Sequence, residues 1–165
     1  MTDDFPTNQI YGFALSGGTG RILYGLKQIN CCYLVYSNNI EHYLAMLLHD
    51  QPSYVLGLGT YSGADQDQIR IETICTNQFR NDYVDGNEKQ KVTINSFLSE
   101  NSQMKLAEAT GNSHCNLVSC KIMQLINQGK LNAQYTFLHI PKRMKPWVTT
   151  ETIDQKLIEF KQTLQ

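Results

Sequence analysis

Residues 115–141 read CNLVSCKIMQLINQGKLNAQYTFLHIP, and this stretch predicts a helix followed by an apolar, strand-like run. Apolar side chains recur at helical spacing from Cys115 to Gln128, and Gly129 suits the end of that helix. The run from Tyr135 to Ile140 is strand-like, and Pro141 stops it. The run from Cys31 to Tyr36 is apolar throughout, as a buried parallel strand should be. Strands that alternate with helices are typical of α/β proteins.

The same alternation of strands and helices extends through the rest of the chain. Strands are predicted at Ile10–Leu15, Cys31–Tyr36, Tyr54–Leu58 and Ile69–Thr76, and helices near Arg21–Gln28, from Ser37 or Asn38 to about His49, and after Thr149 or Thr150. The polar stretch 77–90 is expected to be a long loop or hairpin, and the pattern over 92–98 is ambiguous. We therefore predict one α/β domain over residues 1–165, a three-layer α/β/α sandwich with a mostly parallel central sheet.

Composition places the chain among globular proteins. Of its 165 residues, 41% are hydrophobic and 18% are charged, and the formal net charge is −1. This charge gives no reason to expect a nucleic-acid or membrane-surface partner, and no apolar run is long enough to span a bilayer. The start Met1-Thr2-Asp3-Asp4 is acidic, unlike the basic start of a signal peptide. We therefore expect a cytoplasmic protein.

Five cysteines do not predict a disulfide framework in a chain of this length, because their number is odd and no pair has C-x-x-C spacing. Cys31, Cys32 and Cys75 fall in strand-like runs and are interpreted as buried apolar thiols. Cys115 differs because it stands where a helix begins, and the start of a helix favours a negative charge.

Cys115, His139 and Glu72 form a candidate cysteine-hydrolase triad. A thiol attacks as the thiolate, which the helix N-terminus and a neighbouring imidazolium would both favour. His139 ends the strand that follows the Cys115 helix, so a right-handed return would bring it towards the thiol. Glu72 could accept a hydrogen bond from the imidazole, and amides at the helix start could serve as oxyanion donors. Three ordinary structural residues remain the alternative, because these residue types are common.

Other candidate groups fit less well. His114 adjoins Cys115 in sequence, but adjacent residues on a helix point about 100° apart, so His114 is a poor base for that thiol. His42 and His49 lie on a predicted surface helix and are expected to be solvated. The glycine-rich segment Ser16–Gly20 follows a strand, as a phosphate-binding loop would, but it lacks both the full dinucleotide fingerprint and a following Lys-Ser/Thr.

The segments around the triad candidates resemble the pyroglutamyl peptidase I family, the pyrrolidone-carboxylate cysteine peptidases. The most specific similarities are the cysteine segment, with Gly111, Cys115 and Asn116, and the histidine segment Phe137–Pro141. Further similarities lie at Gly12–Phe13, at Val55–Gly59 and at Glu72 with Asn77, and the order Glu, Cys, His is that of the family.

This resemblance implies an α/β/α fold and removal of N-terminal pyroglutamate from peptides, without metal or cofactor. The residues that it assigns are Cys115, His139 and Glu72 as catalytic and Phe13, Ser113 and His114 as substrate-binding. Family members commonly form homo-oligomers, so a homo-oligomer that acts on a peptide or small amide is implied.

The chain departs from the family pattern around the pocket for the acyl group. The segment between Glu72 and Cys115 looks shortened, and Ala14-Leu15-Ser16 stands where the family has a second Phe. The polar pair Ser113-His114 stands where the family usually has apolar residues, Thr73 replaces an Arg, and Arg80 stands near a family arginine.

Two interpretations therefore remain open. The chain is either a cysteine hydrolase of this type, acting on pyroglutamyl or a related small acyl group, or a catalytically silent relative. A silent relative would keep the fold as a binding or assembly module. The retained Glu72, Cys115 and His139 favour the first interpretation, and the altered pocket favours the second.

Overall fold

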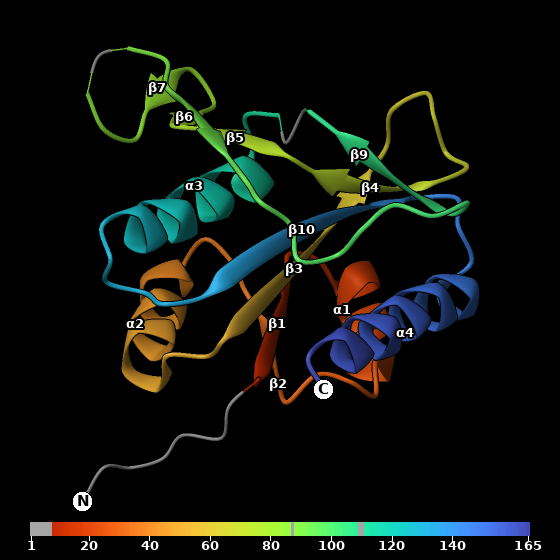
Figure 1. The fold of residues 1–165 in the computed structure, drawn as a ribbon. Helices are drawn as coiled ribbons and strands as arrows, with labels where there is room; N and C mark the ends of the chain where they lie inside the picture. Colours follow the sequence, from red (N-terminus) through yellow and green to blue (C-terminus); the bar gives the residue numbers. More distant parts are fainter. Residues whose placement is uncertain (1–7, 87, 109–110) are drawn as a thin grey trace, which may run out of the picture.

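The computed structural model describes residues 8–86, 88–108 and 111–165, and its centre is a six-stranded sheet in the order β2-β1-β3-β10-β4-β9 (Figure 1). The strands are β1 (Ile10–Ala14), β2 (Cys31–Leu34), β3 (Tyr54–Tyr61), β4 (Ile69–Glu72), β9 (Met104–Ala107) and β10 (Gln134–Pro141). Strands β1, β2, β3 and β10 are parallel, whereas β4 runs antiparallel to β10 and β9 runs parallel to β4. The sheet is therefore mostly parallel, as predicted.

Helices cover both faces of this sheet. Helices α1 (Gly17–Gly25) and α4 (Pro146–Thr163) pack together on one face, and α2 (Ile40–Asp50) and α3 (His114–Asn127) lie on the other (Figure 1). Each helix turns an apolar stripe towards the sheet; on α2, for example, Tyr43 and Leu47 are one turn apart and both are buried. The predicted three-layer α/β/α sandwich is confirmed. Among the described residues, no helix combines the length and apolarity needed to cross a membrane.

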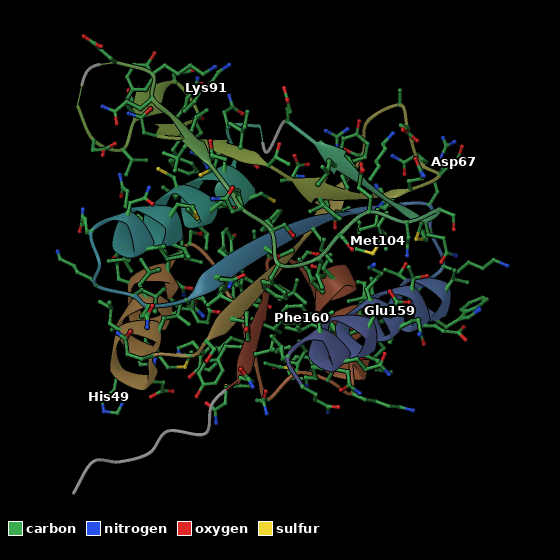
Figure 2. The ribbon with its side chains drawn as sticks, in the orientation of Figure 1. His49, Asp67, Lys91, Met104, Glu159 and Phe160 are labelled. Carbon is green, nitrogen blue, oxygen red and sulfur yellow. The ribbon has the colours of Figure 1, made fainter. Side chains whose placement is uncertain are left out.

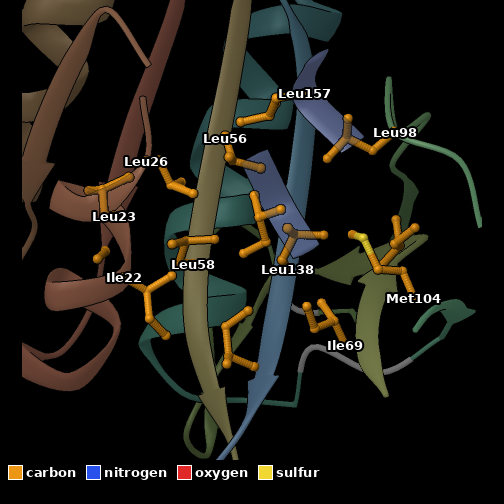
Figure 3. Close-up of a cluster of buried hydrophobic side chains, with 14 of the residues drawn as sticks. Ile22, Leu23, Leu26, Leu56, Leu58, Ile69, Leu98, Met104, Leu138 and Leu157 are labelled. Carbon is orange, nitrogen blue, oxygen red and sulfur yellow. The ribbon is translucent and has the colours of Figure 1, made fainter. Parts of the chain in front are cut away.

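The core between the sheet and the α1–α4 layer is aliphatic. Leu56 and Leu58 of β3 and Leu138 of β10 are fully buried on this face, where α1 and α4 contribute residues such as Leu23 and Leu157 (Figure 3). Side chains alternate between the two faces of a strand. His139, which lies between Leu138 and Ile140 on β10, therefore points to the opposite face, the one covered by α2 and α3.

The core on the α2–α3 face is aromatic and contains two glycines of β3. A Cβ at Gly57 would lie 2.5 Å from the Phe13 ring and 2.6 Å from the Phe137 ring, so only glycine leaves these rings their present positions. Gly59, two residues further along the same face, leaves space that the sulfur of Cys115 occupies. The glycine run of β3 thus sets how closely α3 approaches the sheet.

Two short antiparallel strand pairs extend beyond the main sheet, near the start of α3 (Figure 1). Strand β5 (Ile74–Thr76) pairs with β8 (Lys91–Thr93), and β6 (Gln78–Phe79) pairs with β7 (Asp82–Tyr83). The buried side chain of Asn77 organises this region: it donates to the carbonyls of Asp85 and Glu88 and accepts from the amide of Gln90. The hairpin alternative for the stretch 77–90 is therefore the better description.

Two predicted helix starts are wrong. Helix α1 begins at Gly17 rather than near Arg21, because the Ser16 side chain accepts a hydrogen bond from the Thr19 amide and caps it. The segment Ser16–Gly20 is thus largely helical and not a loop. Helix α4 begins at Pro146, before Thr149, since proline is well suited to the first helical position.

The strand predictions need four corrections, the first being that β3 continues to Tyr61, beyond the predicted end at Leu58. The strand expected at Ile69–Thr76 is interrupted at Thr73, whose amide and hydroxyl both donate to the carbonyl of Ala107. Strand β2 lies at the edge of the sheet and is half-buried, not fully buried, so Cys31 and Cys32 are half-buried thiols. Strand β9 was not predicted.

The remaining cysteine and histidine expectations on α2 and β5 are confirmed. Cys75 is a buried thiol. His42 and His49 are exposed on α2, and Figure 2 shows His49 at the outer end of that helix, away from β10.

Candidate active site

His139 lies near the carboxyl end of β10, between Gly59 of β3 and Arg70 of β4 in the strand register. Its ring atom Nδ1 is 2.7 Å from Oε1 of Glu72, and only 5% of the residue is exposed. Because a carboxylate only accepts, this contact assigns the proton to Nδ1. The other ring nitrogen, Nε2, is then left as the basic atom of the imidazole.

Glu72 also accepts a hydrogen bond from Arg70, a residue that the sequence analysis did not single out. Nε of Arg70 lies 3.2 Å from Oε1 of Glu72, the same oxygen that His139 contacts. The Arg70 guanidinium lies 4.4 Å from the centre of the Tyr61 ring. Residues two apart in a strand share a face, so the alternating run could have indicated that Arg70 lies beside Glu72.

Cys115 is the second residue of α3, and its sulfur lies directly over β3. A Cβ at Gly59 would be 2.7 Å from Sγ of Cys115, and Gly59 is the register partner of His139. The thiol, the imidazole and the Glu72 carboxylate therefore gather on one face of the sheet. Within the described residues no hydrogen bond joins Cys115 to His139, so the contact between nucleophile and base is not made in this conformation.

The thiol of Cys115 is protonated at neutral pH in this conformation. Burial raises its pKa from 9.0 to about 11, and the nearby Glu72 carboxylate also raises it, while the Ser113 side chain and the backbone lower it by hydrogen bonding. The sequence led us to expect a thiolate favoured by the helix start. Here burial outweighs the hydrogen bonds from Ser113 and the backbone, because removing the thiolate from water costs more than these bonds return.

Asn116 fixes the start of α3 against the β5–β6 segment. Its buried side chain accepts from the Thr76 amide at 2.8 Å and donates to the carbonyls of Thr76 and Gln78. Asn116 follows Cys115 directly, so the same bonds hold the position of the thiol. In the sequence, Asn116 stands out only as part of the cysteine segment, and its bonds to β5 and β6 are not predictable there.

The residues expected to bind substrate lie in different surroundings. His114 packs against Phe79 of β6, with ring centres 5.2 Å apart, and the Arg80 guanidinium lies 5.2 Å from the centre of the same Phe79 ring. Ser113 is exposed beside the thiol. Ser113 and His114 precede Cys115 directly in the chain, and Phe79 is an aromatic neighbour of His114 that local sequence patterns did not indicate.

Phe13 instead lies within the aromatic core. It has no exposed surface and packs against Tyr43, Tyr135 and Phe137. Its contact with the site runs through Phe137, whose ring centre lies 5.0 Å from that of His139. A direct contact between Phe13 and a substrate stays a prediction.

A cavity of about 340 Å³ adjoins the start of α3. It is lined by Gly111 and Asn112, which precede the cysteine, and by residues of β5, β6 and β8 that include Thr76, Gln78 and Lys91. In parallel α/β sheets, ligands bind beyond the carboxyl ends of the strands, and the carboxyl end of β10 with the start of α3 forms such an edge here.

This arrangement of helices and strands is that of solved pyroglutamyl peptidases. Pyroglutamyl peptidase I from Bacillus amyloliquefaciens superposes with a TM-score of 0.71 at 11% identity, over 92% of this chain and 94% of that chain. Pyrrolidone carboxyl peptidase from Thermococcus litoralis gives 0.68 at 14% identity, over 92% and 91%. The chain has the pyrrolidone carboxyl peptidase fold.

This chain also superposes on a mutant pyrrolidone carboxyl peptidase from P. furiosus, with a TM-score of 0.64 at 16% identity over 92% of this chain and 95% of that chain. No protein-family model matches this sequence, and no curated protein does. The resemblance read from short segments is therefore confirmed for the fold, in a divergent sequence.

Proposed function

We propose that this protein is a cysteine hydrolase in which Cys115 is the nucleophile, His139 the general base and Glu72 the residue that orients the imidazole. The observation that carries the proposal is the hydrogen bond from Nδ1 of His139 to buried Glu72, with the Cys115 sulfur above the register partner of His139. The likeness of the whole fold to pyroglutamyl peptidases supports the same reaction class.

The reaction would begin with transfer of the thiol proton to Nε2 of His139 as sulfur attacks the carbonyl carbon of an amide. The tetrahedral intermediate would collapse to a thioester, and the imidazolium would give its proton to the departing amine. A water molecule would then lose a proton to Nε2 and attack the thioester, which releases the acid and restores the thiol. Because the resting thiol is protonated and not bonded to His139, substrate binding would have to bring Sγ within reach of Nε2.

The start of α3 would stabilise the oxyanion of each tetrahedral intermediate. The first turn of a helix has amides without partners inside the helix, and here they lie around Cys115. Amide donors fixed before the reaction stabilise the charge that develops in the transition state. The Asn116 side chain would keep this turn in place against β5 and β6.

The proposed substrate is a peptide or small amide with an N-terminal pyroglutamyl or related small acyl group. Pyroglutamyl peptidase is what the similar structures are named for. Ser113 and His114, which precede the nucleophile, are polar where the family usually has apolar residues, so a pocket for the pyrrolidone ring would differ from that of the family. We propose a homo-oligomer of cytoplasmic location that acts on such substrates without a nucleic-acid or membrane partner.

A panel of fluorogenic amides tests this proposal. We expect hydrolysis of at least one small acyl or aminoacyl amide, loss of that hydrolysis in Cys115→Ser and in His139→Ala, and retention of it in Cys120→Ala. Cys120 is the matched control, because it is a thiol on the same helix and does not reach the site. Turnover of no amide in the panel, or activity that survives Cys115→Ser, would contradict the proposal and favour a silent binding module.

A further inference from the structure

The Glu72 carboxylate is fully buried, yet it lies between two cationic or potentially cationic groups. Its Oε1 accepts from Nε of Arg70 at 3.2 Å and lies 2.7 Å from Nδ1 of His139. A buried carboxylate is costly unless charge and hydrogen bonds compensate it. Arg70 carries a permanent positive charge, whereas His139 carries one only when protonated.

Arg70 is held firmly in this position. Its side chain is 14% exposed, its guanidinium lies 4.4 Å from the centre of the Tyr61 ring, and its strand β4 pairs with β10 and β9 on either side. The neighbouring cation on β9, Lys105, is the register partner of Arg70 but forms an ion pair with Asp65. The positive charge beside Glu72 therefore comes from Arg70 by a defined contact and not from a diffuse basic patch.

The charge of Arg70 decides which protonation state of His139 the site stabilises. Loss of that charge would make it more favourable for buried Glu72 to attract a proton, either onto the imidazole or onto its own oxygen. In the first case His139 would be an imidazolium with no free nitrogen. In the second case Glu72 would no longer hold the imidazole by a charge-assisted bond. Neither state suits a general base, because Nε2 of His139 must be unprotonated and correctly held to take the thiol proton.

From this geometry we infer that Arg70 is a positioning residue of the active site: it keeps Glu72 ionised while His139 stays neutral, with Nδ1–H directed at Glu72. The inference rests on the proposed function for its catalytic consequence but not for its effect on His139. The titratable and charged groups that face His139 within the described residues are Glu72 and Arg70 from β4, Tyr61 from β3 and Cys115 from α3. Arg70 is the permanent cation in this set.

Ring-nitrogen NMR of His139 tests the inference directly, because ¹⁵N shifts distinguish the two neutral tautomers and the imidazolium. The chain has 4 histidines, so a His139→Ala sample assigns the signal. We expect the Nδ1–H tautomer in the unmodified protein. In Arg70→Gln the midpoint of the His139 titration should move upwards by about 1 pH unit, the lower end of the effect of a charge at this range. Arg70→Lys should move it by much less.

Lys105→Gln is the matched control, because it removes the same charge one strand further from Glu72. It should leave the His139 titration unchanged. If the protein hydrolyses an amide, the acid limb of kcat/KM should move in Arg70→Gln by the same amount as the NMR midpoint, with KM changed less than kcat. A shift of His139 without any hydrolysis would uphold the role of Arg70 and contradict only the proposed function.

A double substitution keeps the test decisive if Arg70→Gln folds poorly. Arg70→Gln/Glu72→Gln has no buried charge left to compensate, so it should be more stable than Arg70→Gln alone, and its His139 titration should match that of Glu72→Gln. An unchanged titration in Arg70→Gln, an equal shift in Lys105→Gln, or a double variant no more stable than the single one would overturn the inference.

Discussion

At the scale of single residues, the site depends on the missing side chain of Gly59. A Cβ at this position would lie 2.7 Å from Sγ of Cys115 and 2.8 Å from Cζ of Phe137. These separations are too short for ordinary contact, so the sulfur or the ring must move. The thiol is the group whose displacement would cost the reaction most, since its geometry towards the substrate carbonyl sets the rate.

We predict that Gly59→Ala lowers kcat/KM by at least about 100-fold while lowering the free energy of unfolding by about 1–3 kcal/mol, the usual effect of overpacking. Gly17→Ala is the control, because a Cβ there meets nothing within 4 Å. Steady-state kinetics on the best amide of the panel and urea unfolding measure the two effects. Full activity in Gly59→Ala would mean that the sulfur does not need its place over β3.

The sequence identified the chemical groups of the site better than their surroundings. Glu72, Cys115 and His139 were candidates because each sits in a local context that suits its role. Arg70 was missed because its importance depends on Glu72 and His139 meeting across β4 and β10, an antiparallel pairing that local patterns do not reveal. The raised pKa of Cys115 was missed for the same reason, since burial under a packed helix is a property of the tertiary structure.

At the scale of elements, the Asn116 side chain joins the start of α3 to β5 and β6 by hydrogen bonds. Asn116 satisfies the amide and the carbonyl of Thr76 and the carbonyl of Gln78. These bonds replace the water that the backbone of β5 would otherwise need. They also hold Phe79, which follows Gln78, beside His114.

Asn116→Ala should therefore lower the free energy of unfolding by about 3 kcal/mol, because it leaves buried backbone groups without partners. Hydrogen exchange at the Thr76 amide should accelerate in this variant. Asn112→Ala is the comparison, since the exposed Asn112 side chain makes one long bond to the Arg80 carbonyl, at 3.3 Å. Equal effects of the two substitutions would show that Asn116 does not anchor the helix.

The elements themselves were predictable where the pattern was long and periodic. The α2, α3 and β10 predictions hold because apolar spacing is long and regular in each segment, although the N-cap of α2 is Asn39 and not the predicted Ser37 or Asn38. Strand β9 was missed because Met104–Ala107 is short, lies at the sheet edge and buries only Met104. The early start of α1 was missed because glycines at 17, 18 and 20 suggest a loop, whereas the Ser16 cap stabilises a helix.

At the scale of the whole molecule, buried thiols make the free energy of unfolding fall as the pH becomes alkaline. Burial raises the pKa of Cys75 from 9.0 to about 12 and that of Cys120 from 9.0 to about 11, and both side chains are fully buried. Both groups bind protons more tightly in the folded state than in the unfolded state. Their contribution to stability is therefore complete below about pH 9 and is lost as the pH rises towards 11–12.

We predict that the free energy of unfolding falls between pH 9 and pH 11 by about 1.4 kcal/mol per pH unit for each of these thiols. Urea unfolding at a series of pH values measures the slope. Replacing Cys75 and Cys120 with alanine should reduce the slope, even though the variant is less stable at pH 7. A slope that does not change in this variant would assign the alkaline loss to other groups, such as the buried tyrosines Tyr43 and Tyr135, whose pKa values burial also raises.

The central claim is that Cys115 forms a covalent acyl intermediate with the help of His139. Intact-mass and peptide mass spectrometry after rapid quenching, with a small activated acyl ester as substrate, tests it most directly. The account predicts a single acyl adduct on Cys115 that forms and then hydrolyses in the unmodified protein, is absent in Cys115→Ser, and forms at least about 100-fold more slowly in His139→Ala. An adduct on another cysteine such as half-buried Cys31, or no adduct at all, would contradict the account.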